Sequence, residues 1–291
     1  MTRWLVTGAG GMLGRDLLGL LHDEDVTGLT RADLDVTDLP AVQSAVAGAD
    51  VVLNAAAWTD VDRAESEEAS AFAVNAVGPA NLSLACAASG ARLVHVSTDY
   101  VFPGDGSAPY PEGGQIDPRS AYGRTKAAGE WAVRAYLPSR AWVVRTAWLY
   151  AGHGSNFVQT MLRLEKERET LDVVADQRGQ PTWSRDLARR IVDMVGADVP
   201  PGTYHGTAAG DATWCDLARA VFEFIGADPR RVRPTTTDRF PRPAPRPAYS
   251  VLGHDAWRAV GMAPMRPWKQ ALREAMGDAP DPAPEPLPSP L

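Results

Sequence analysis

The first half of the chain alternates short β-rich runs with longer stretches whose apolar positions recur at the spacing of a helix. The short runs predict β-strands at Trp4–Val6, Asp25–Leu29, Asp50–Asn54, Arg92–Ser97 and Ala141–Thr146. The longer stretches predict helices at Met12–Leu21, Leu39–Val46, Ala64–Ala88 and Ala121–Tyr136. Nearly apolar strands separated by helices are typical of a parallel sheet covered on both faces. With right-handed crossovers, the pattern predicts an α/β fold with a doubly wound, Rossmann-type parallel sheet.

After Trp148 the rhythm changes and the strands become sparse. Helices are predicted at Asn156–Glu167, Trp183–Val195, Thr213–Ile225 and Trp268–Met276, and strands at Leu171–Val174 and Thr203–His205. The segment Arg230–Tyr249 is rich in proline and arginine and is expected to be irregular or extended. We therefore expect a first domain over residues 1–150, completed by about residues 170–195, and a smaller α/β domain over residues 151–277. Frequent prolines in residues 278–291 predict a disordered, solvated tail.

Composition narrows the class of protein. The chain has 291 residues, of which 45% are hydrophobic and 22% charged, as in ordinary globular proteins. Its formal net charge of −7 gives no basic footprint for nucleic acid. We find no uninterrupted apolar run near the roughly 20 residues of a membrane span and no hydrophobic leader, so we expect a cytoplasmic protein without a membrane partner. Cys86 and Cys215 are the only cysteines, too few for a disulfide framework or a thiolate zinc site.

The first predicted strand leads into a glycine-rich turn, Thr7-Gly8-Ala9-Gly10-Gly11-Met12-Leu13-Gly14. Gly8 permits a tight turn, Gly11 lets the backbone approach a pyrophosphate, and Gly14 lets the helix pack closely on the strand. The N–H groups at the helix start face the negative charge of that pyrophosphate. Glycines also mark ordinary turns, but between a strand and a helix they predict a dinucleotide site. The TGxxGxxG form resembles the short-chain dehydrogenase/reductase superfamily.

The end of the second strand bears on the choice of cofactor. Thr30 and Arg31 stand where an NAD-specific site usually carries a carboxylate for the ribose hydroxyls. Arg31 can pair with a 2′-phosphate, so NADPH is the expected cofactor and NADH an alternative, since Arg31 can equally be a surface arginine. In this superfamily Asp35 and Val36 would lie beside the adenine.

Tyr122 and Lys126 are four residues apart in the predicted helix Ala121–Tyr136, so both side chains lie on one face. An ammonium near a phenol favours the phenolate, which predicts a lowered tyrosine pKa and proton transfer near neutral pH. This spacing also occurs by chance between solvent-facing residues. Lysine is rare here, however: Lys126, Lys166 and Lys269 are the only lysines among 29 basic residues. A compact, tunable ammonium suits this chemistry better than a guanidinium.

Thr98 follows the fourth predicted strand, at the carboxyl end where parallel sheets carry their sites. Its hydroxyl can hydrogen-bond a substrate carbonyl that becomes an alkoxide, although capping of the strand end is the alternative role. Features at the first strand, the fourth strand and the fourth helix coincide, which favours the catalytic interpretation.

Several segments together are similar to the dTDP-4-dehydrorhamnose reductase family, over residues 1 to about 277. The most characteristic are Asn54-Ala-Ala-Ala-Trp-Thr-Asp-Val-Asp62, Ser97-Thr-Asp-Tyr-Val-Phe102, Tyr122-Gly-Arg-Thr-Lys126 and Arg145-Thr-Ala-Trp148. Further matches are Asn156-Phe157, Met161-Leu-Arg-Leu164, Asp176-Gln177 with Pro181-Thr182, and Arg246-Pro247 with Ser250.

The resemblance implies hydride transfer from NAD(P)H to C4 of dTDP-4-dehydro-L-rhamnose, with residues 1–150 binding the cofactor and residues 151–277 mainly the sugar nucleotide. It implies that Tyr122 protonates the developing alkoxide, that Thr98 holds it, and that Lys126 tunes Tyr122 and grips the ribose. Trp148, one of the implied sugar contacts, can also be a core aromatic. The implied sugar contacts are Thr98, Asp99, Tyr100 and Trp148. The implied cofactor contacts include Gly11, Met12, Leu13, Asp35, Val36, Ala57, Trp58 and Thr59.

Two departures from the family pattern matter. Trp58 stands where a histidine can appear in relatives. Some relatives form metal-assisted dimers through acidic residues. Here Asp16 alone could play part of that role, because Trp183-Ser184-Arg185 stands where an acidic partner for it would be sought. We therefore predict no required metal, and a monomer or homodimer.

Three functions remain open. The first is the rhamnose-pathway reductase. The second keeps the mechanism but changes the sugar, as in a dTDP-sugar 4-ketoreductase or a dihydrostreptose-type synthase of antibiotic deoxysugar assembly. The third is a non-catalytic subunit that only binds dinucleotide, and the intact Thr98, Tyr122 and Lys126 speak against it.

Overall fold

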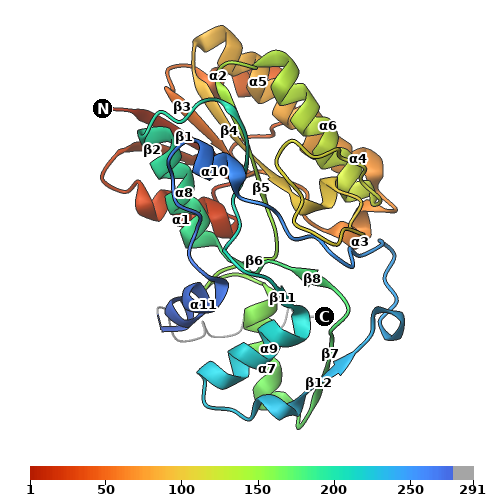
Figure 1. The fold of residues 1–291 in the computed structure, drawn as a ribbon. Coiled ribbons are helices and arrows are strands. Elements are labelled where there is room, and N and C mark those ends of the chain that lie inside the picture. The colour runs from red at the N-terminus through yellow and green to blue at the C-terminus, as the bar shows by residue number, and fades with distance from the viewer. Residues whose placement is uncertain (278–291) are drawn as a thin grey trace, which may run out of the picture.

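A six-stranded parallel sheet forms the centre of the larger lobe, which we call the sheet lobe. The computed structural model describes residues 1–277. The strands run in the order β2-β1-β3-β4-β5-β10 (Figure 1). Their bounds are β1 Arg3–Thr7, β2 Asp25–Leu29, β3 Val51–Asn54, β4 Arg92–Thr98, β5 Ala141–Thr146 and β10 Gly202–His205. The order steps outward from β1 in both directions, which confirms the predicted doubly wound fold.

Helices cover both faces of this sheet. On one face, α1 (Met12–Leu20) and α8 (Ser184–Gly196) pack together, with the short α10 (Asp255–Ala259) beside them. On the other face, α5 (Gly78–Ser89) packs between α2 (Leu39–Val46) and α6 (Ala121–Tyr136). Each face buries its own apolar cluster, so β1, β3, β4 and β5 are apolar on both sides, as the sequence pattern requires.

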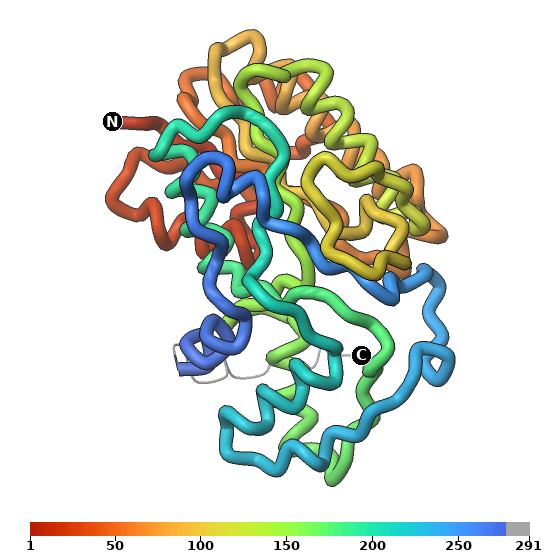
Figure 2. The backbone as a smooth tube through the Cα atoms, in the orientation of Figure 1, coloured from red at the N-terminus to blue at the C-terminus, as the bar shows by residue number. Residues whose placement is uncertain are grey.

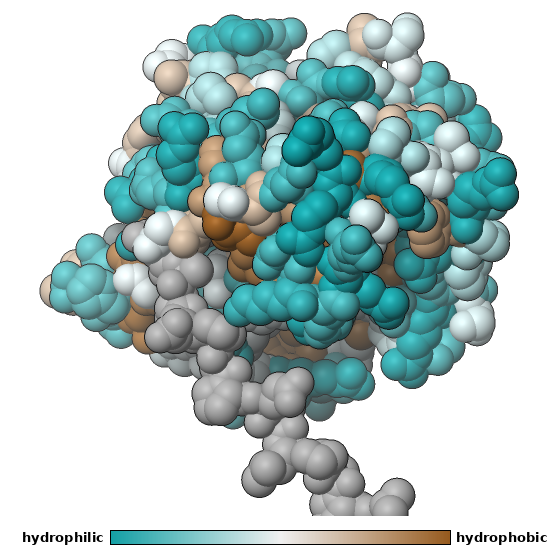
Figure 3. Space-filling model, turned by 90° about the horizontal axis from the view of Figure 1, so that it is seen from below, coloured by the Kyte–Doolittle hydropathy of each residue, from teal (hydrophilic) through white to brown (hydrophobic). Residues whose placement is uncertain are grey.

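The small lobe is the lower part of the backbone in Figure 2. It has its own apolar core, and its sheets within residues 1–277 are two-stranded. The helices α7 (Phe157–Glu167), α9 (Trp214–Phe224) and α11 (Trp268–Gly277) pack around it. Two strand pairs flank them: β7 (Leu171–Val174) with β12 (Val232–Thr235), and β8 (Arg178–Gly179) with β11 (Ala212–Thr213). A third pair, β6 (Leu149–Tyr150) with β9 (Thr182–Trp183), lies where the lobes meet. Seen from below, the surface is mainly hydrophilic, with apolar atoms showing in recesses (Figure 3).

The chain passes between the lobes more than once. After β9 it returns to the sheet lobe to form α8 and then β10, which pairs with β5 in parallel. The sequence predicted that residues 170–195 complete the first domain. This range includes most of α8, but β10 follows it in the chain. The segment 230–249, expected to be irregular or extended, contains β12 and the short 3₁₀ helices Pro229–Arg231 and Thr237–Arg239. The predicted tail, 278–291, lies outside the described residues.

The helix predicted over Ala64–Ala88 was wrong in its details. The structure has α3 (Val61–Ala64), then α4 (Glu68–Phe72), a π-helical turn at Ala73–Val77, and α5. A π turn inserts one extra residue, which an apolar repeat alone does not reveal. The run Glu68–Ser89 is long and apolar enough to cross a membrane by length and composition, although 56% of its apolar window is buried inside the protein. A core helix passes the same test, and here the run packs against α6.

Candidate active site

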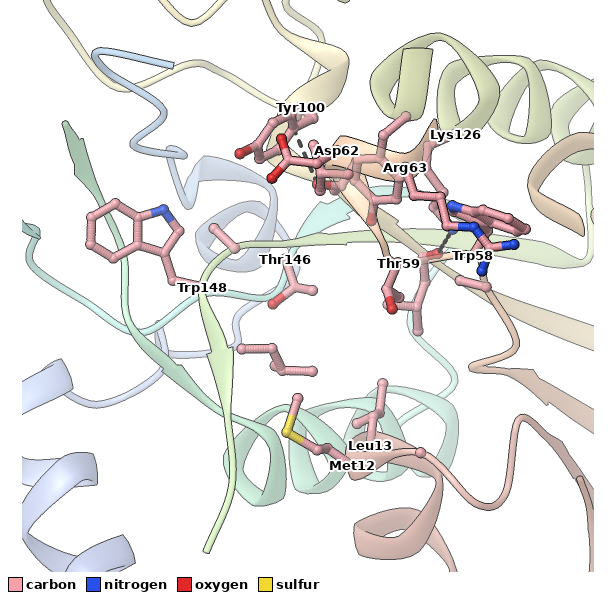
Figure 4. A pocket seen from close by; sticks show the side chains of 18 of the residues that line it. Met12, Leu13, Trp58, Thr59, Asp62, Arg63, Tyr100, Lys126, Thr146 and Trp148 are labelled. Carbon is pink, nitrogen blue, oxygen red and sulfur yellow. Dashed lines mark hydrogen bonds between the residues drawn. The ribbon is translucent and has the colours of Figure 1, made fainter. Parts of the chain in front are cut away.

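A deep cleft of about 1530 Å³ lies at the carboxyl ends of the sheet strands and continues against the small lobe. Side chains from both lobes line it (Figure 4). It contains every residue that the sequence singled out for cofactor, substrate or catalysis. These are Gly8, Gly11, Met12, Leu13, Gly14, Arg31, Asp35, Val36, Ala57, Trp58, Thr59, Thr98, Asp99, Tyr100, Tyr122, Lys126 and Trp148.

The glycine turn forms a backbone cradle at one end of the cleft. Gly8 has a φ of +71°, and a Cβ there would lie 2.5 Å from the backbone N of Ala56. A Cβ on Gly14 would lie 2.3 Å from the carbonyl oxygen of Gly8. Gly11 is the N-cap of α1, and no side chain caps this helix start. The first N–H groups of α1 are thus left for a ligand, and the cradle fits a pyrophosphate.

The end of β2 supplies a positive charge. Arg31 is exposed and lines the cleft. The nearby carboxylate of Asp33 is already engaged, because it accepts hydrogen bonds from the N–H of Thr30 at 2.9 Å and from its hydroxyl. Asp35 likewise accepts from the N–H of Thr37 at 2.9 Å, which lowers its pKa. Free ribose hydroxyls would need a carboxylate as hydrogen-bond acceptor, and the carboxylates of Asp33 and Asp35 already accept from Thr30 and Thr37. The arrangement therefore fits a ribose 2′-phosphate that pairs with Arg31 better.

Asn75, in the π-helical turn, ties the loop after β3 to α6. Its Oδ1 accepts from the N–H of Trp58 at 2.8 Å, while its Nδ2 donates to the carbonyl of Trp58 and to Oγ1 of Thr125, both at 3.1 Å. Asn75 is fully buried. The sequence analysis missed this residue, although an asparagine flanked by apolar residues in a helical run was the available signal. Asn75 therefore orients the predicted cofactor loop relative to the helix that carries Tyr122 and Lys126.

The start of α6 is fixed by two side chains. Ser120 caps it by accepting from the N–H of Gly123 at 3.1 Å, and Oε1 of Glu65 accepts from the N–H of Ala121 at 2.8 Å. One turn along, Nζ of Lys126 donates to the carbonyl of Val96 in β4 at 2.6 Å. This brings Tyr122 and Lys126 against the carboxyl end of β4, beside Thr98.

The predicted pKa of Tyr122 was wrong for the free protein. Burial raises the pKa of the phenol to about 12, and a hydrogen bond with Thr98 opposes this only in part. Burial also lowers the pKa of Lys126 to about 8, while the charge of Glu130 opposes that change. The neighbouring groups that act on the pKa of Tyr122 are Thr98 and Asp99, and Lys126 is not among them. At neutral pH the phenol therefore keeps its proton.

Thr98 and Asp99 form a buried polar pair at the end of β4. Oγ1 of Thr98 donates to Oδ1 of Asp99 at 2.9 Å and accepts from the N–H of Tyr100 at 3.2 Å. Burial raises the pKa of Asp99 to about 6, against the lowering effect of Ser250 and Thr98. The hydroxyl proton of Thr98, expected to face the substrate, is thus directed at Asp99 in the free protein.

The far wall of the cleft comes from scattered segments. Trp148 stacks on Trp214 with ring centroids 3.6 Å apart. From the sheet lobe, Asp62 pairs with Arg246 at 2.8 Å between Oδ2 and Nη2, and its Oδ1 accepts from the N–H of Ala244 at 3.2 Å. Sequence reasoning did not place several lining residues in the site: Asp62, Thr146, Phe157, Gln177, Trp214 and Ser250.

Asp16, considered above as part of a metal site, is engaged inside the protein. Its Oδ1 lies 3.1 Å from Nε2 of His153, and its other oxygen accepts from the hydroxyl of Ser184. Asp16 thus joins α1 to the loop before α7 and to the start of α8. Within residues 1–277 no group of three or more His, Cys, Asp or Glu side chains is arranged to hold a metal.

The chain is similar to known sugar-nucleotide reductases over nearly its whole length. Residues 2–280 match the family model described as RmlD substrate binding domain. A dTDP-4-keto-6-deoxy-D-glucose reductase of Streptomyces niveus is 53% identical, with 94% of this chain and 96% of that protein covered. A dTDP-4-dehydrorhamnose reductase of Streptomyces griseus is also 53% identical, with 94% and 92% covered.

A crystal structure of dTDP-4-dehydrorhamnose reductase from Bacillus anthracis in complex with NADP superimposes with a TM-score of 0.92. It is 37% identical, and the match covers 96% of this chain and 100% of that one. The family model, the identities and the shared fold agree over the same residues. The chain belongs to the dTDP-4-dehydrorhamnose reductase family.

Proposed function

We propose that this chain uses NADPH to reduce the C4 ketone of a dTDP-4-keto-6-deoxy sugar, converting dTDP-4-dehydro-L-rhamnose to dTDP-L-rhamnose. One observation carries the proposal: Tyr122, Lys126 and Thr98 meet at the end of β4, in the same cleft as the glycine cradle. The cradle fits a dinucleotide, and the trio fits proton delivery to a neighbouring ketone. The B. anthracis relative in complex with NADP supports the choice of cofactor.

NADPH supplies the hydride that adds to the ketone carbon. The N–H groups of Met12 and Leu13 at the uncapped start of α1 face its pyrophosphate. Arg31 pairs with its 2′-phosphate, because a guanidinium binds phosphate oxygens in a forked geometry. Lys126 holds the nicotinamide ribose. The remaining contacts are Gly8, Gly11, Gly14, Asp35, Val36, Ala57, Trp58 and Thr59, all of which line this part of the cleft.

Tyr122 delivers the proton. Its pKa of about 12 keeps the phenol protonated at neutral pH. The C4 oxygen becomes an alkoxide, which is a stronger base than a phenolate, so transfer from Tyr122 runs downhill. The ammonium of Lys126 then stabilises the phenolate left behind. Thr98 orients the phenol and the new hydroxyl, and it must turn its own proton from Asp99 towards the sugar oxygen to do so.

The sugar nucleotide occupies the rest of the cleft. Asp99, Tyr100 and Trp148 contact the sugar. Arg242 and Arg246 give this side of the cleft a positive charge, which suits the diphosphate. Under this proposal residues 1–150, with the later elements of the sheet lobe, bind the cofactor, and the remainder of 151–277 mainly binds the sugar nucleotide. A cytoplasmic location and a monomeric or homodimeric state stay predictions.

A second candidate keeps the mechanism and changes the sugar. The two Streptomyces relatives are equally similar to this chain, yet their names give different substrates. A dTDP-sugar 4-ketoreductase or a dihydrostreptose-type synthase of antibiotic deoxysugar assembly therefore remains the alternative. The non-catalytic subunit is disfavoured, because Thr98, Tyr122 and Lys126 lie together in the cleft.

The test is NADPH oxidation by the purified chain with dTDP-4-dehydro-L-rhamnose and with dTDP-4-keto-6-deoxy-D-glucose. Products are identified by mass spectrometry and NMR. Stoichiometric formation of dTDP-L-rhamnose supports the first candidate, and reduction of only the second sugar supports the alternative. Tight dinucleotide binding without reduction of either sugar would reject the enzyme altogether.

A further inference from the structure

Two tryptophans from distant parts of the chain stack at the small-lobe wall of the cleft. Trp148 follows β5, and Trp214 is the first residue of α9. Their ring centroids are 3.6 Å apart with an interplanar angle of 7°, so one face of Trp148 is covered by Trp214. Figure 4 shows Trp148 on the side of the pocket away from Trp58 and Arg63.

Trp148 is held in an unfavourable backbone conformation. Its φ of +45° lies in the left-handed region, which bulky residues rarely adopt. Within residues 1–277 only Asp198 shares a positive φ among residues other than glycine. Such strain persists where surrounding contacts over-determine the conformation, typically at a ligand site. Gly179 supplies one such contact, because a Cβ there would lie 2.5 Å from Cε2 of Trp148.

Trp214 is anchored from behind. Its Nε1 donates to Oε1 of Gln177 at 3.1 Å, and Nε2 of Gln177 donates to Oγ1 of Thr237 at 3.0 Å. Phe157 packs on Trp214 with ring centroids 4.7 Å apart. Gln177 is buried, so these bonds are shielded from water. The position of Trp214 is thus set by the residue just before β8, by the 3₁₀ helix that follows β12 and by α7. Trp214 in turn limits where the indole of Trp148 can lie.

We propose that Trp214 is a positioning residue for substrate: by stacking on one face of Trp148, it fixes that indole so that the part of the ring that lines the cleft contacts the sugar. This inference rests on the proposed function, in which Trp148 contacts the sugar. A side chain that contacts a ligand binds it best when it is rigid, because no rotamer freedom is then lost on binding. Gly179 approaches Cε2, Nε1 and Cζ2 of the indole closely, and Trp214 stacks on one face, so two sets of contacts hold the ring in place.

A double-mutant cycle tests the proposal. Trp214→Ala should raise the KM for the sugar nucleotide roughly three- to tenfold, the value expected for one aromatic pair. The KM for NADPH and kcat should change less than twofold, and Trp214→Phe should recover part of the loss. In a Trp148→Ala background, Trp214→Ala should add almost nothing, since its effect passes through Trp148. Trp131→Ala, on the outer side of α6 with 57% of the residue exposed, is the matched control.

A spectroscopic measurement follows the stack without turnover. Two closely stacked indoles should give an exciton couplet in the far-ultraviolet circular dichroism of the wild type. Trp148→Ala and Trp214→Ala should each abolish it, and Trp131→Ala should leave it intact. The same double-mutant cycle can also be measured without catalysis, as the dissociation constant of dTDP-L-rhamnose determined by calorimetry.

Additive losses in the cycle, or equal binding by Trp214→Ala and Trp131→Ala, would overturn the positioning role. A wild type that reduces neither keto sugar would instead reject the proposed function, so the two failures differ. Thermal melting of each variant identifies a general loss of folding, in which case Trp214→Phe carries the test.

Discussion

The two ends of the cleft are built in different ways. The cofactor end comes from short segments that each follow a sheet strand, and its cradle is made of backbone from Gly8 to Gly14. The substrate end comes from side chains of distant segments, such as Asp62 with Arg246 and Trp148 with Trp214. A backbone cradle tolerates few changes. A wall of side chains can be altered residue by residue, and equally similar relatives named for different sugars fit that difference.

The largest effect is expected where the two ends meet. Tyr122→Phe removes the proton donor and should lower kcat roughly a hundred- to ten-thousandfold, the usual contribution of general acid catalysis. NADPH should bind as before, because the ring and its packing remain. Steady-state kinetics and a fluorescence titration with NADPH measure the two effects. Tyr136→Phe, at the exposed end of the same helix, is the control. A normal kcat for Tyr122→Phe would remove Tyr122 from the mechanism.

The charge on Lys126 predicts a pH dependence at the cofactor end. Its pKa of about 8 means that the ammonium is present below pH 8 and lost as the pH rises. The kcat/KM for NADPH, which reports the free enzyme, should fall about tenfold per pH unit above pH 8. The stability of the folded protein changes with pH in the opposite direction to this kcat/KM. The unfolded lysine keeps its proton up to about 10.5, so the wild type should gain stability between these values relative to Lys126→Met. A kcat/KM that stays flat to pH 10 contradicts the assignment.

Arg31→Ala tests whether the cofactor end selects a phosphate. NADPH should lose affinity roughly ten- to a hundredfold, because a charged hydrogen-bonding partner of the 2′-phosphate is gone. NADH should be almost unaffected, which makes the ratio of the two KM values the diagnostic measurement. Equal losses for both cofactors would show that Arg31 is only a surface arginine.

The smallest effect is expected from the ion pair at the substrate end, between Asp62 and Arg246. Asp62→Asn leaves Arg246 without its charged partner, and the side chains of Arg246 and Asp62 are 19% and 26% exposed. The KM for the sugar nucleotide should rise about threefold, in line with a partly exposed pair, while the KM for NADPH stays constant. Asp228→Asn, which breaks the exposed pair with Arg230, should change neither value. A change confined to NADPH would place Asp62 with the cofactor end instead.

The same contrast explains what could be predicted from the sequence. Strands β2, β5 and β7 and helices α2 and α6 have the predicted bounds, because apolar periodicity and local capping determine them. Residues for both ends were found through motifs, and all of them line the cleft. The motifs, however, do not indicate how deeply a titratable side chain is buried in the cleft. The pKa of Tyr122 is therefore shifted in the direction opposite to the prediction, because burial of the phenol is the largest effect on it.

Long-range pairing accounts for what was missed. Nothing near Asp62 in sequence indicates that it pairs with Arg246. The pairing of β10 with β5 brings together strands about sixty residues apart, for instance Gly202 with Trp142. The π-helical turn around Asn75 likewise depends on contacts with Trp58 and Thr125, which a helical repeat does not contain.

The edge strand β10 has a consequence for expressing a fragment of this protein. Because β10 covers the outer edge of β5, a polypeptide ending at Tyr150 would expose a row of unpaired backbone N–H and C=O groups along an apolar strand. Such an open border recruits other chains and favours aggregation. We therefore expect residues 1–150 produced alone to aggregate unless the later strand is supplied in trans or fused by a short linker.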